Sequence, residues 1–201
     1  KNIAELEKTK ENIEKIANNF DNVKQKISNA LLLEFKDDLE KWNAEIDGTI
    51  FRFKSPDILF SRGKSSLKKE FKNILLNFFP RYINILKEFS LDIEEIRIEG
   101  HTSSKWNKDS SIEESYINNA QLSQTRALEV LKYSISKTNI ENNFEWLLKV
   151  TRANGLSFSK IILNKDGTEN FESSRRVEFR VMTNIENQLD KITYILNKKD
   201  N

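Results

Sequence analysis

The chain offers few side chains of the kinds that catalyse reactions or ligate metals. It has one histidine, His101, and no cysteine, so histidine pairs, thiolate nucleophiles and cysteine-based zinc sites are excluded. A Ser-His-acid triad would have to use His101, which follows a glycine at a predicted strand end, where a structural hydrogen-bonding role is the commoner one. Neither a G-x-G-x-x-G motif nor a phosphate loop occurs. The residues therefore favour a binding protein without cofactor or metal over an enzyme.

A set of residues suited to binding an anion lies in the stretch IEGHTSSKWNKDSSIEESYINNAQLSQTRALEVL, residues 98–131. Its front half reads as a strand ending at Gly100, after which backbone N–H groups can point into an open crevice. In the predicted helix that follows, Asn119, Leu122 and Arg126 have the three-four spacing of a single face. Arg126 offers a planar fork of donors that matches a carboxylate. The stretch predicts a site for a small anionic group.

Between that strand and that helix, residues 103–116 are polar and read as a long loop. The loop carries three acids, Asp109, Glu113 and Glu114. A solvated surface is the simplest interpretation of such acids, because charged side chains in loops are mostly exposed.

Three segments together resemble the OmpA/MotB/Pal C-terminal domain, the peptidoglycan-binding module of bacterial envelopes. They are IRIEGHT from Ile96, NAQLSQTRALEVL from Asn119 and SRRVEFRV from Ser174, and they stand in the order of the family. A fourth segment, ILFSRGKSSLKKE from Ile58, is similar to the family's first strand-to-helix connection. The resemblance extends from Gly48 to Met182.

The resemblance implies a β-α-β-α-β-β fold whose crevice holds the meso-diaminopimelate part of the peptidoglycan stem peptide. In the family an Asp directly after the His-Thr pair meets the ligand's ammonium, and the Arg of the R-A pair meets its carboxylate. By this resemblance, Arg126 is the residue that would bind the carboxylate of the ligand. The other ligand-binding residues that the resemblance implies are Thr102, Ser103, Ser104, Asn119, Leu122 and Arg176, the second Arg of the final-strand motif after Arg175.

The sequence departs from the family pattern at three points. Ser103 stands where the Asp is expected, so the anion that faces the ammonium is missing. Asn119 follows Ser103 by 16 positions, about twice the family's separation, and we expect Asp109, or else Glu113 or Glu114, to fold back as a substitute acid. The segment RANGLSFSKII from Arg152 lacks the proline of the family's Gly-rich turn.

Residues 1–47 are predicted to form a long amphipathic helix, because no Gly or Pro interrupts them before Gly48. Ile13, Ile16, Phe20, Val23 and Ile27 follow a 3-4-3-4 spacing that places them on one stripe. Two interpretations stay open for this helix. Its second half packs on its own domain while the first half serves as stalk, linker or dimer contact, or the stripe forms a coiled coil with a second chain.

Residues 48–184 are expected to form the OmpA-like domain, and residues 185–201 a C-terminal amphipathic tail. The pattern predicts an α/β (α+β) sandwich with helices on one face of a mixed sheet. Within the OmpA-like domain, the first helix is expected to begin near Ser65 or Ser66. Pro80 indicates either a kink in that helix or the start of a second one. The expected strands are 49–53, 93–99, 144–152 and 176–182, and the helix after the polar loop is expected over 119–137.

Composition narrows the possible partners. Lys plus Arg number 33 against 31 for Asp plus Glu, and the two signs are interleaved along the chain, which argues against nucleic-acid binding. No apolar run approaches the ~18 residues of a membrane span. Because the chain begins with Lys1, we expect a fragment whose membrane anchor lies upstream.

Two functions follow from these observations. The first is a non-catalytic, periplasmic peptidoglycan-binding domain that anchors a membrane or envelope complex to the cell wall, as in the stator B-subunits of ion-driven motors. Its partners would be peptidoglycan, a membrane protein reached through the upstream segment and a second copy bound through the N-terminal helix. The alternative is the same fold used for dimerisation or protein docking, with a ligand site degraded by Ser103.

Overall fold

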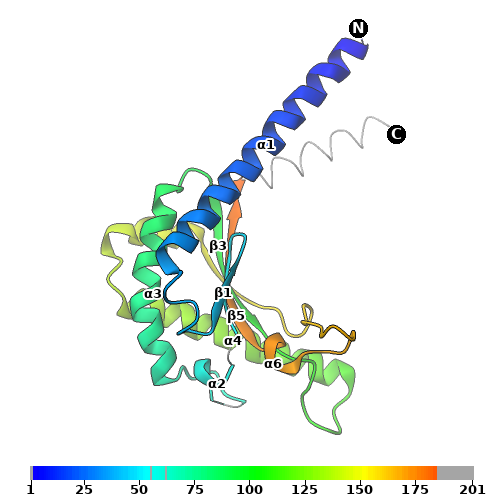
Figure 1. Ribbon diagram of the computed structural model, residues 1–201. Helices are drawn as coiled ribbons and strands as arrows, with labels where there is room; N and C mark the ends of the chain where they lie inside the picture. The colour runs from blue at the N-terminus through cyan, green and yellow to red at the C-terminus, as the bar shows by residue number, and fades with distance from the viewer. Residues whose placement is uncertain (1, 55, 62, 185–201) are drawn as a thin grey trace.

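A computed structural model of the chain describes residues 2–54, 56–61 and 63–184 (Figure 1). The helices are α1 (Asn2–Phe35), α2 (Pro56–Leu59), α3 (Lys69–Glu88), α4 (Ile112–Lys137), the 3-10 helix η1 (Glu141–Asn143), α5 (Phe144–Val150) and α6 (Phe171–Ser174). The strands are β1 (Ala44–Asp47), β2 (Ile50–Phe53), β3 (Ile93–His101), β4 (Thr151–Gly155) and β5 (Arg176–Thr183). The predicted C-terminal tail, 185–201, lies outside the described residues.

The five strands form one mixed sheet in the order β1-β2-β5-β3-β4. Only β3 and β4 pair in parallel among these strands, and α4 makes the crossover between them. The helices α3 and α4 bury apolar side chains against one face of the sheet (Figure 1). The predicted α/β fold with a mixed sheet is therefore confirmed.

The core on the helical face is rich in aromatic rings. Phe78 of α3 lies with its ring centroid 4.5 Å from that of Phe51, 5.3 Å from that of Phe35 and 4.9 Å from that of Phe179. Pro80 lies inside α3, which continues to Glu88, so no second helix begins there. Apolar residues on both sides of Pro80 are buried in the same core, and this packing outweighs the backbone hydrogen bond that a proline removes.

The second half of α1 packs on the domain, as one of the two interpretations predicted. Val23, Ile27, Leu31 and Phe35 are buried in the common core, whereas the first half of the helix extends away from the sheet (Figure 1). The side chains of Ile16 and Phe20 lie outside what the structure describes, and pairing with a second chain stays a prediction. Among the described residues, no helix combines the length and apolar character needed to cross a bilayer.

Two expected elements differ in the structure. The N-terminal helix ends at Phe35, and a strand that the sequence did not predict, β1, forms a hairpin with β2. Gly48 turns this hairpin with a φ of 58°, a conformation open to glycine. Residues 144–150 are helical rather than extended, because Leu147 and Val150 have a three-residue spacing that buries both on one helical face.

Candidate ligand-binding cleft

The helix that carries the predicted site begins earlier than the sequence indicated. Ser111 caps α4 with a capping box, in which its Oγ accepts from the Glu114 backbone N–H at 3.1 Å and the Glu114 carboxylate accepts from the Ser111 N–H at 3.0 Å. Glu113 and Glu114 belong to the first turn, where acids favour the helix dipole. The structure therefore places neither of them as the substitute acid, and the loop shrinks to residues 103–110.

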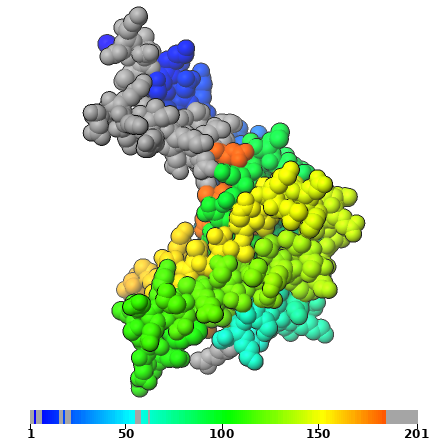
Figure 2. All heavy atoms as spheres, turned by 180° about the vertical axis from the view of Figure 1, so that it is seen from behind, coloured from blue at the N-terminus to red at the C-terminus, as the bar shows by residue number. Residues whose placement is uncertain are grey.

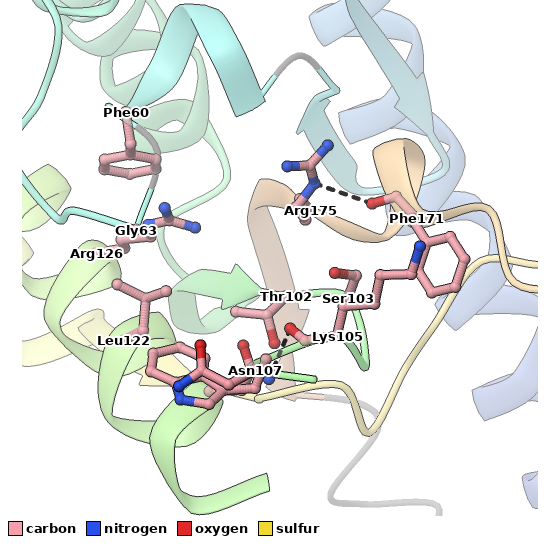
Figure 3. Close-up of a pocket in the computed structure, with 12 residues that line it drawn as sticks. Phe60, Gly63, Thr102, Ser103, Lys105, Asn107, Leu122, Arg126, Phe171 and Arg175 are labelled. Atoms are coloured by element: carbon pink, nitrogen blue, oxygen red, sulfur yellow. Dashed lines mark hydrogen bonds between the residues drawn. The ribbon is translucent and has the colours of Figure 1, made fainter. Parts of the chain in front are cut away.

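The end of β3 and the middle of α4 enclose an open cavity of about 570 Å³ (Figure 3). We call it the arginine cavity. It lies at the end of the molecule remote from α1, where the loop and first turns of α4, in green in Figure 2, protrude. Its lining residues are Phe60, Gly63, Thr102, Ser103, Lys105, Trp106, Asn107, Asn119, Leu122, Arg126, Phe171 and Arg175.

Five of the predicted site residues meet at this cavity. Thr102 and Ser103 form its strand-end wall, and Asn119, Leu122 and Arg126 form its helix wall. Gly100 permits this approach of strand and helix, since a Cβ there would lie 2.3 Å from the Ser123 carbonyl oxygen. The spacing argument thus placed both walls correctly, and ligand binding by these residues stays a prediction.

Arg126 is buried without an anionic partner. Its side chain is 7% exposed, its Nε donates to the Lys64 carbonyl at 3.0 Å, and its guanidinium carbon lies 4.7 Å from the centre of the Phe60 ring. In the part of the chain that the structure describes, no carboxylate pairs with it. Burial, together with the charge of Arg175, lowers the pKa of Arg126 to about 10. The group is still charged at neutral pH, so the cavity presents an uncompensated cation.

Arg175 adds a second guanidinium to the cavity. It follows α6, whose first turn is capped by Asn170 through a 2.9 Å hydrogen bond from the Ser173 N–H. The Nε of Arg175 donates to the Phe171 carbonyl at 3.0 Å, which holds the side chain between the two walls (Figure 3). Two arginines from distant parts of the sequence therefore lie at one opening, suited to an anionic group.

The structure does not place Arg176 at the cavity. Successive residues of a strand point to opposite faces, so Arg175 reaches the cavity while Arg176 lies on the far face of the sheet. There its Nε donates to Glu178 at 2.6 Å, and its Nη1 donates to the Lys160 and Ser174 carbonyls at 3.1 Å. Of the two arginines in the motif, Arg175 lines the cavity and Arg176 does not.

Arg176 belongs to a buried ion-pair network that we call the sheet-face network. Glu178 lies at its centre and also accepts from Arg52 at 2.8 Å and from Arg180 at 3.0 Å. Burial alone would raise the pKa of Glu178, but His101 and the guanidinium groups of Arg176 and Arg52 lower it to about 2. The carboxylate is thus held charged by the cations around it.

His101 lies inside the same network, 3.5 Å from Glu99 and 3.6 Å from Glu178. These three residues have the types and proximity of a metal site. However, Arg180 pairs with both carboxylates, and Arg176 and Arg52 pair with Glu178, so their negative charge is already neutralised. Burial lowers the pKa of His101. Its ring nitrogens form no hydrogen bond with the described residues, so the hydrogen-bonding role expected from the sequence is not observed.

Asp109 and Ser104, both predicted for the site, do not line the arginine cavity. Asp109 is exposed in the loop. Ser104 faces Glu169 instead, whose carboxylate accepts hydrogen bonds from the Ser104 N–H, at 3.0 Å, and from its hydroxyl. In the described part of the chain no cationic side chain pairs with Glu169.

Sequence reasoning missed Glu169 altogether. It lies 65 positions beyond Ser104, in a hairpin closed by a bridge to Leu163 and turned at Gly167, whose φ is 84°. No local pattern predicts a contact across such a distance. The absence of the family's proline in this segment was the only signal that its path would differ.

A mixed sheet with helices on one face, and a cation-lined cavity where β3 ends, are the features expected of an OmpA-type domain. The OmpA family model matches residues 59–177, and the chain belongs to this family.

The relatives agree with this assignment. The chain is 44% identical over 185 residues to the Zorya protein ZorB of Escherichia coli, a match that covers 91% of this chain and 79% of ZorB. The fold is similar to the cell wall anchor of the T6SS from Pseudomonas aeruginosa, with a TM-score of 0.51, 21% identity and coverage of 76% and 96%. It is also similar to a putative MotB-like protein from Desulfovibrio vulgaris, with a TM-score of 0.53, 18% identity and coverage of 79% and 90%.

Proposed function

We propose that this domain anchors an envelope complex to the cell wall by binding the diaminopimelate centre of the peptidoglycan stem peptide on the periplasmic side. The observation that carries the proposal is Arg126, a buried guanidinium at an open cavity with no carboxylate partner among the described residues. The family membership and the likeness to a cell wall anchor support it.

The chemistry of the ligand matches the cavity. The free end of diaminopimelate carries a carboxylate and an ammonium on one carbon. The carboxylate pairs with Arg126, whose desolvation has already occurred on folding, so that a charge-assisted hydrogen bond contributes about 1.5–3 kcal/mol. Arg175 lies at the same opening and adds to the attraction.

Glu169 is our candidate for the acid that faces the ammonium, in place of Asp109. Two hydrogen bonds from Ser104, the residue after Ser103, hold its carboxylate near the strand-end wall, although neither Ser104 nor Glu169 lines the cavity itself. A carboxylate has about four acceptor positions, so capacity remains for a ligand. With Arg126 on the helix wall, this arrangement suits a zwitterion.

The N-terminal helix is our candidate for the connection between this domain and the rest of the complex. The first half of α1 extends away from the cavity end of the domain (Figure 1), as a stalk between the wall and a membrane partner would. A second copy bound through this half remains part of the proposal.

Sedimentation with purified sacculi that contain diaminopimelate tests the proposal. The chain should pellet with the sacculi, Arg126→Ala should stay mostly in the supernatant, and Asn119→Ala should bind more weakly. Arg152→Ala, which removes a largely exposed arginine of β4, is the matched control and should pellet like the wild type.

Two results would overturn it. If the wild type stays in the supernatant while a known wall binder pellets, the alternative of a dimerisation or docking module replaces wall anchoring. If Arg126→Ala pellets as well as the wild type, wall binding is real but uses another surface.

A further inference from the structure

We infer that the loop after β3 builds a second subsite, beside the arginine cavity, that binds an N-acetylated sugar of the glycan strand. The inference rests on the proposed function, because it concerns the part of peptidoglycan to which the stem peptide is attached. Its central residue is Trp106, an uncharged side chain that has no part in the proposed recognition of the carboxylate and the ammonium.

Trp106 lies at the junction of three hollows. It lines the arginine cavity, a more open hollow of about 470 Å³ that we call the tryptophan groove, and a third hollow of about 640 Å³ on the side of Lys108 and Phe158. Its side chain is 37% exposed, although an indole ring is among the side chains that gain most from burial. A large aromatic face therefore remains available at the edge of the ligand site.

The loop holds Trp106 in place through its neighbours. Ser104 is tied to Glu169 by the hydrogen bonds described above. The Lys105 carbonyl accepts from the Asn119 side-chain amide at 3.5 Å, and the Lys105 ammonium lies 3.7 Å from the centre of the Phe171 ring. The two residues before Trp106 are thus tied to Glu169, to Phe171 and to Asn119 of the helix wall, which limits the positions that Trp106 can take.

The tryptophan groove has the lining that a sugar requires. Hydroxyl and amide side chains surround the indole, from Ser65 and Ser66 on one side and from Asn118, Gln121 and Thr125 of α4 on the other. Such groups both donate and accept hydrogen bonds, as sugar hydroxyls and an acetamido group do. The C–H face of a pyranose packs on an aromatic ring, and an apolar wall with a few convergent polar groups is typical of small-molecule sites. A peptide anchor would instead call for a contiguous apolar patch.

The groove adjoins the arginine cavity, since Gly63, Trp106 and Leu122 line both. In peptidoglycan the free diaminopimelate centre is joined to the sugar through three methylenes, a γ-linked D-Glu, L-Ala and a lactyl ether, a tether of about 15–20 Å when extended. A ligand seated on Arg126 can therefore set its sugar on a surface within that reach, and the groove beside the cavity is one such surface. Lys64 is the one charged residue among the described residues that line the groove, whereas Lys105 and Lys108 both line the third hollow.

Calorimetric titration with two ligands tests the inference. One is the free tripeptide L-Ala-γ-D-Glu-meso-diaminopimelate, and the other is the same tripeptide attached to the N-acetylglucosamine–N-acetylmuramic acid disaccharide. We expect the wild type to bind the disaccharide ligand about tenfold more tightly, a gain typical of one aromatic contact with a hydrogen bond. Trp106→Ala should abolish this difference. Because Trp106 also lines the arginine cavity, the affinity of the same variant for the free tripeptide is the internal reference for any change in the cavity itself.

Two further variants sharpen the test. Trp106→Phe keeps an aromatic face and should retain most of the gain, and Gln121→Ala should reduce it by about threefold, as expected for the loss of one weak hydrogen bond. Tyr116→Ala is the matched control, because Tyr116 is an exposed aromatic residue of α4 that lines none of the three hollows.

The possible failures are distinguishable. Equal affinities of the wild type for the two ligands would contradict the sugar subsite and leave the proposed function intact. An equal loss for both ligands in Trp106→Ala would also contradict it, because the loop would then only shape the arginine cavity. If neither ligand binds the wild type, the proposed function fails and the inference fails with it.

Discussion

Arg126 and Arg176 are equally buried, at 7% and 6% exposure, yet their surroundings differ. Arg176 donates to the Glu178 carboxylate and to two backbone carbonyls. Arg126 donates to one backbone carbonyl and lies over an aromatic ring. In the folded chain the buried charges of the sheet-face network are therefore paired, whereas Arg126 in the arginine cavity has no carboxylate partner among the described residues.

The difference separates a structural role from a binding role. A buried charge without a counter-charge raises the energy of the folded state. Its presence beside an opening is the basis of our proposal that an external group supplies the partner. The burial of arginine by itself does not indicate a binding site, since Arg176 is just as buried. The informative feature is burial without an anion.

The largest effect is expected from Glu178→Gln, which removes the central anion of the sheet-face network. Arg176 then loses its one carboxylate partner among the described residues, while Arg52 keeps Glu45 and Arg180 keeps Glu99. Breaking such a buried network costs about 3–5 kcal/mol of unfolding free energy. Denaturant titration followed by circular dichroism measures the change. Glu129→Gln, which breaks a surface pair with Lys132, is the control and should change stability by less than about 1 kcal/mol.

Arg126→Ala should show the opposite pattern. Stability should change by no more than about 1 kcal/mol, because the lost packing is offset by relief of an unpaired buried charge. Affinity for the tripeptide should fall about tenfold to a hundredfold, as expected for a lost charge-assisted interaction. If this variant were as destabilised as Glu178→Gln, Arg126 would be a structural residue and the contrast between the two regions would disappear.

A smaller effect is expected from Glu169→Gln, which removes the candidate acid while it preserves shape. Affinity for the tripeptide should fall about tenfold, and affinity for a tripeptide with an acetylated amine on the free diaminopimelate centre should not change. Ser103→Asp in the Glu169→Gln background should restore binding of the free amine by returning a carboxylate to the strand end. Absence of that rescue, together with equal losses for both ligands, would show that Glu169 only holds the loop.

The smallest effect on stability is expected from a change in pH. Burial lowers the pKa of His101 in the folded state below its usual 6.5, so the unfolded chain binds the proton more readily. This contribution to stability is complete above pH 6.5 and is lost as pH falls toward the folded pKa. Glu178, whose pKa is about 2 when folded, adds a second loss as pH falls below its unfolded value near 4.5. Midpoints of thermal unfolding from pH 8 to pH 3 should fall in this order. His101→Gln should remove the first decline and reduce the second, because His101 contributes to the low pKa of Glu178.

The sequence alone predicted the fold class and five residues of the cavity. A helical three-four spacing brought Asn119, Leu122 and Arg126 onto one wall, and the strand-ending Gly100 located the other wall. These signals are local, so a single sequence contains them.

The features that the sequence could not predict depend on contacts between distant residues, or on the exact residue at which a helix or strand begins. The choice between Arg175 and Arg176 depends on the residue at which β5 begins, because each step along a strand reverses the side chain's direction. The partnership of Ser104 with Glu169 depends on the path of a hairpin far along the chain. Val150 and its neighbours have a spacing that fits a short helix as well as a strand, and only burial in the core decides between them.

The central claim is that a carboxylate of the ligand pairs with the guanidinium of Arg126. A double-mutant cycle tests this claim most directly. The dissociation constants of the wild type and Arg126→Ala are measured for the tripeptide and for a tripeptide whose carboxylate at the free diaminopimelate centre is amidated. The account predicts that amidation weakens binding to the wild type about tenfold or more and leaves binding to Arg126→Ala unchanged. An equal loss in both proteins would contradict it, because the carboxylate would then be recognised elsewhere.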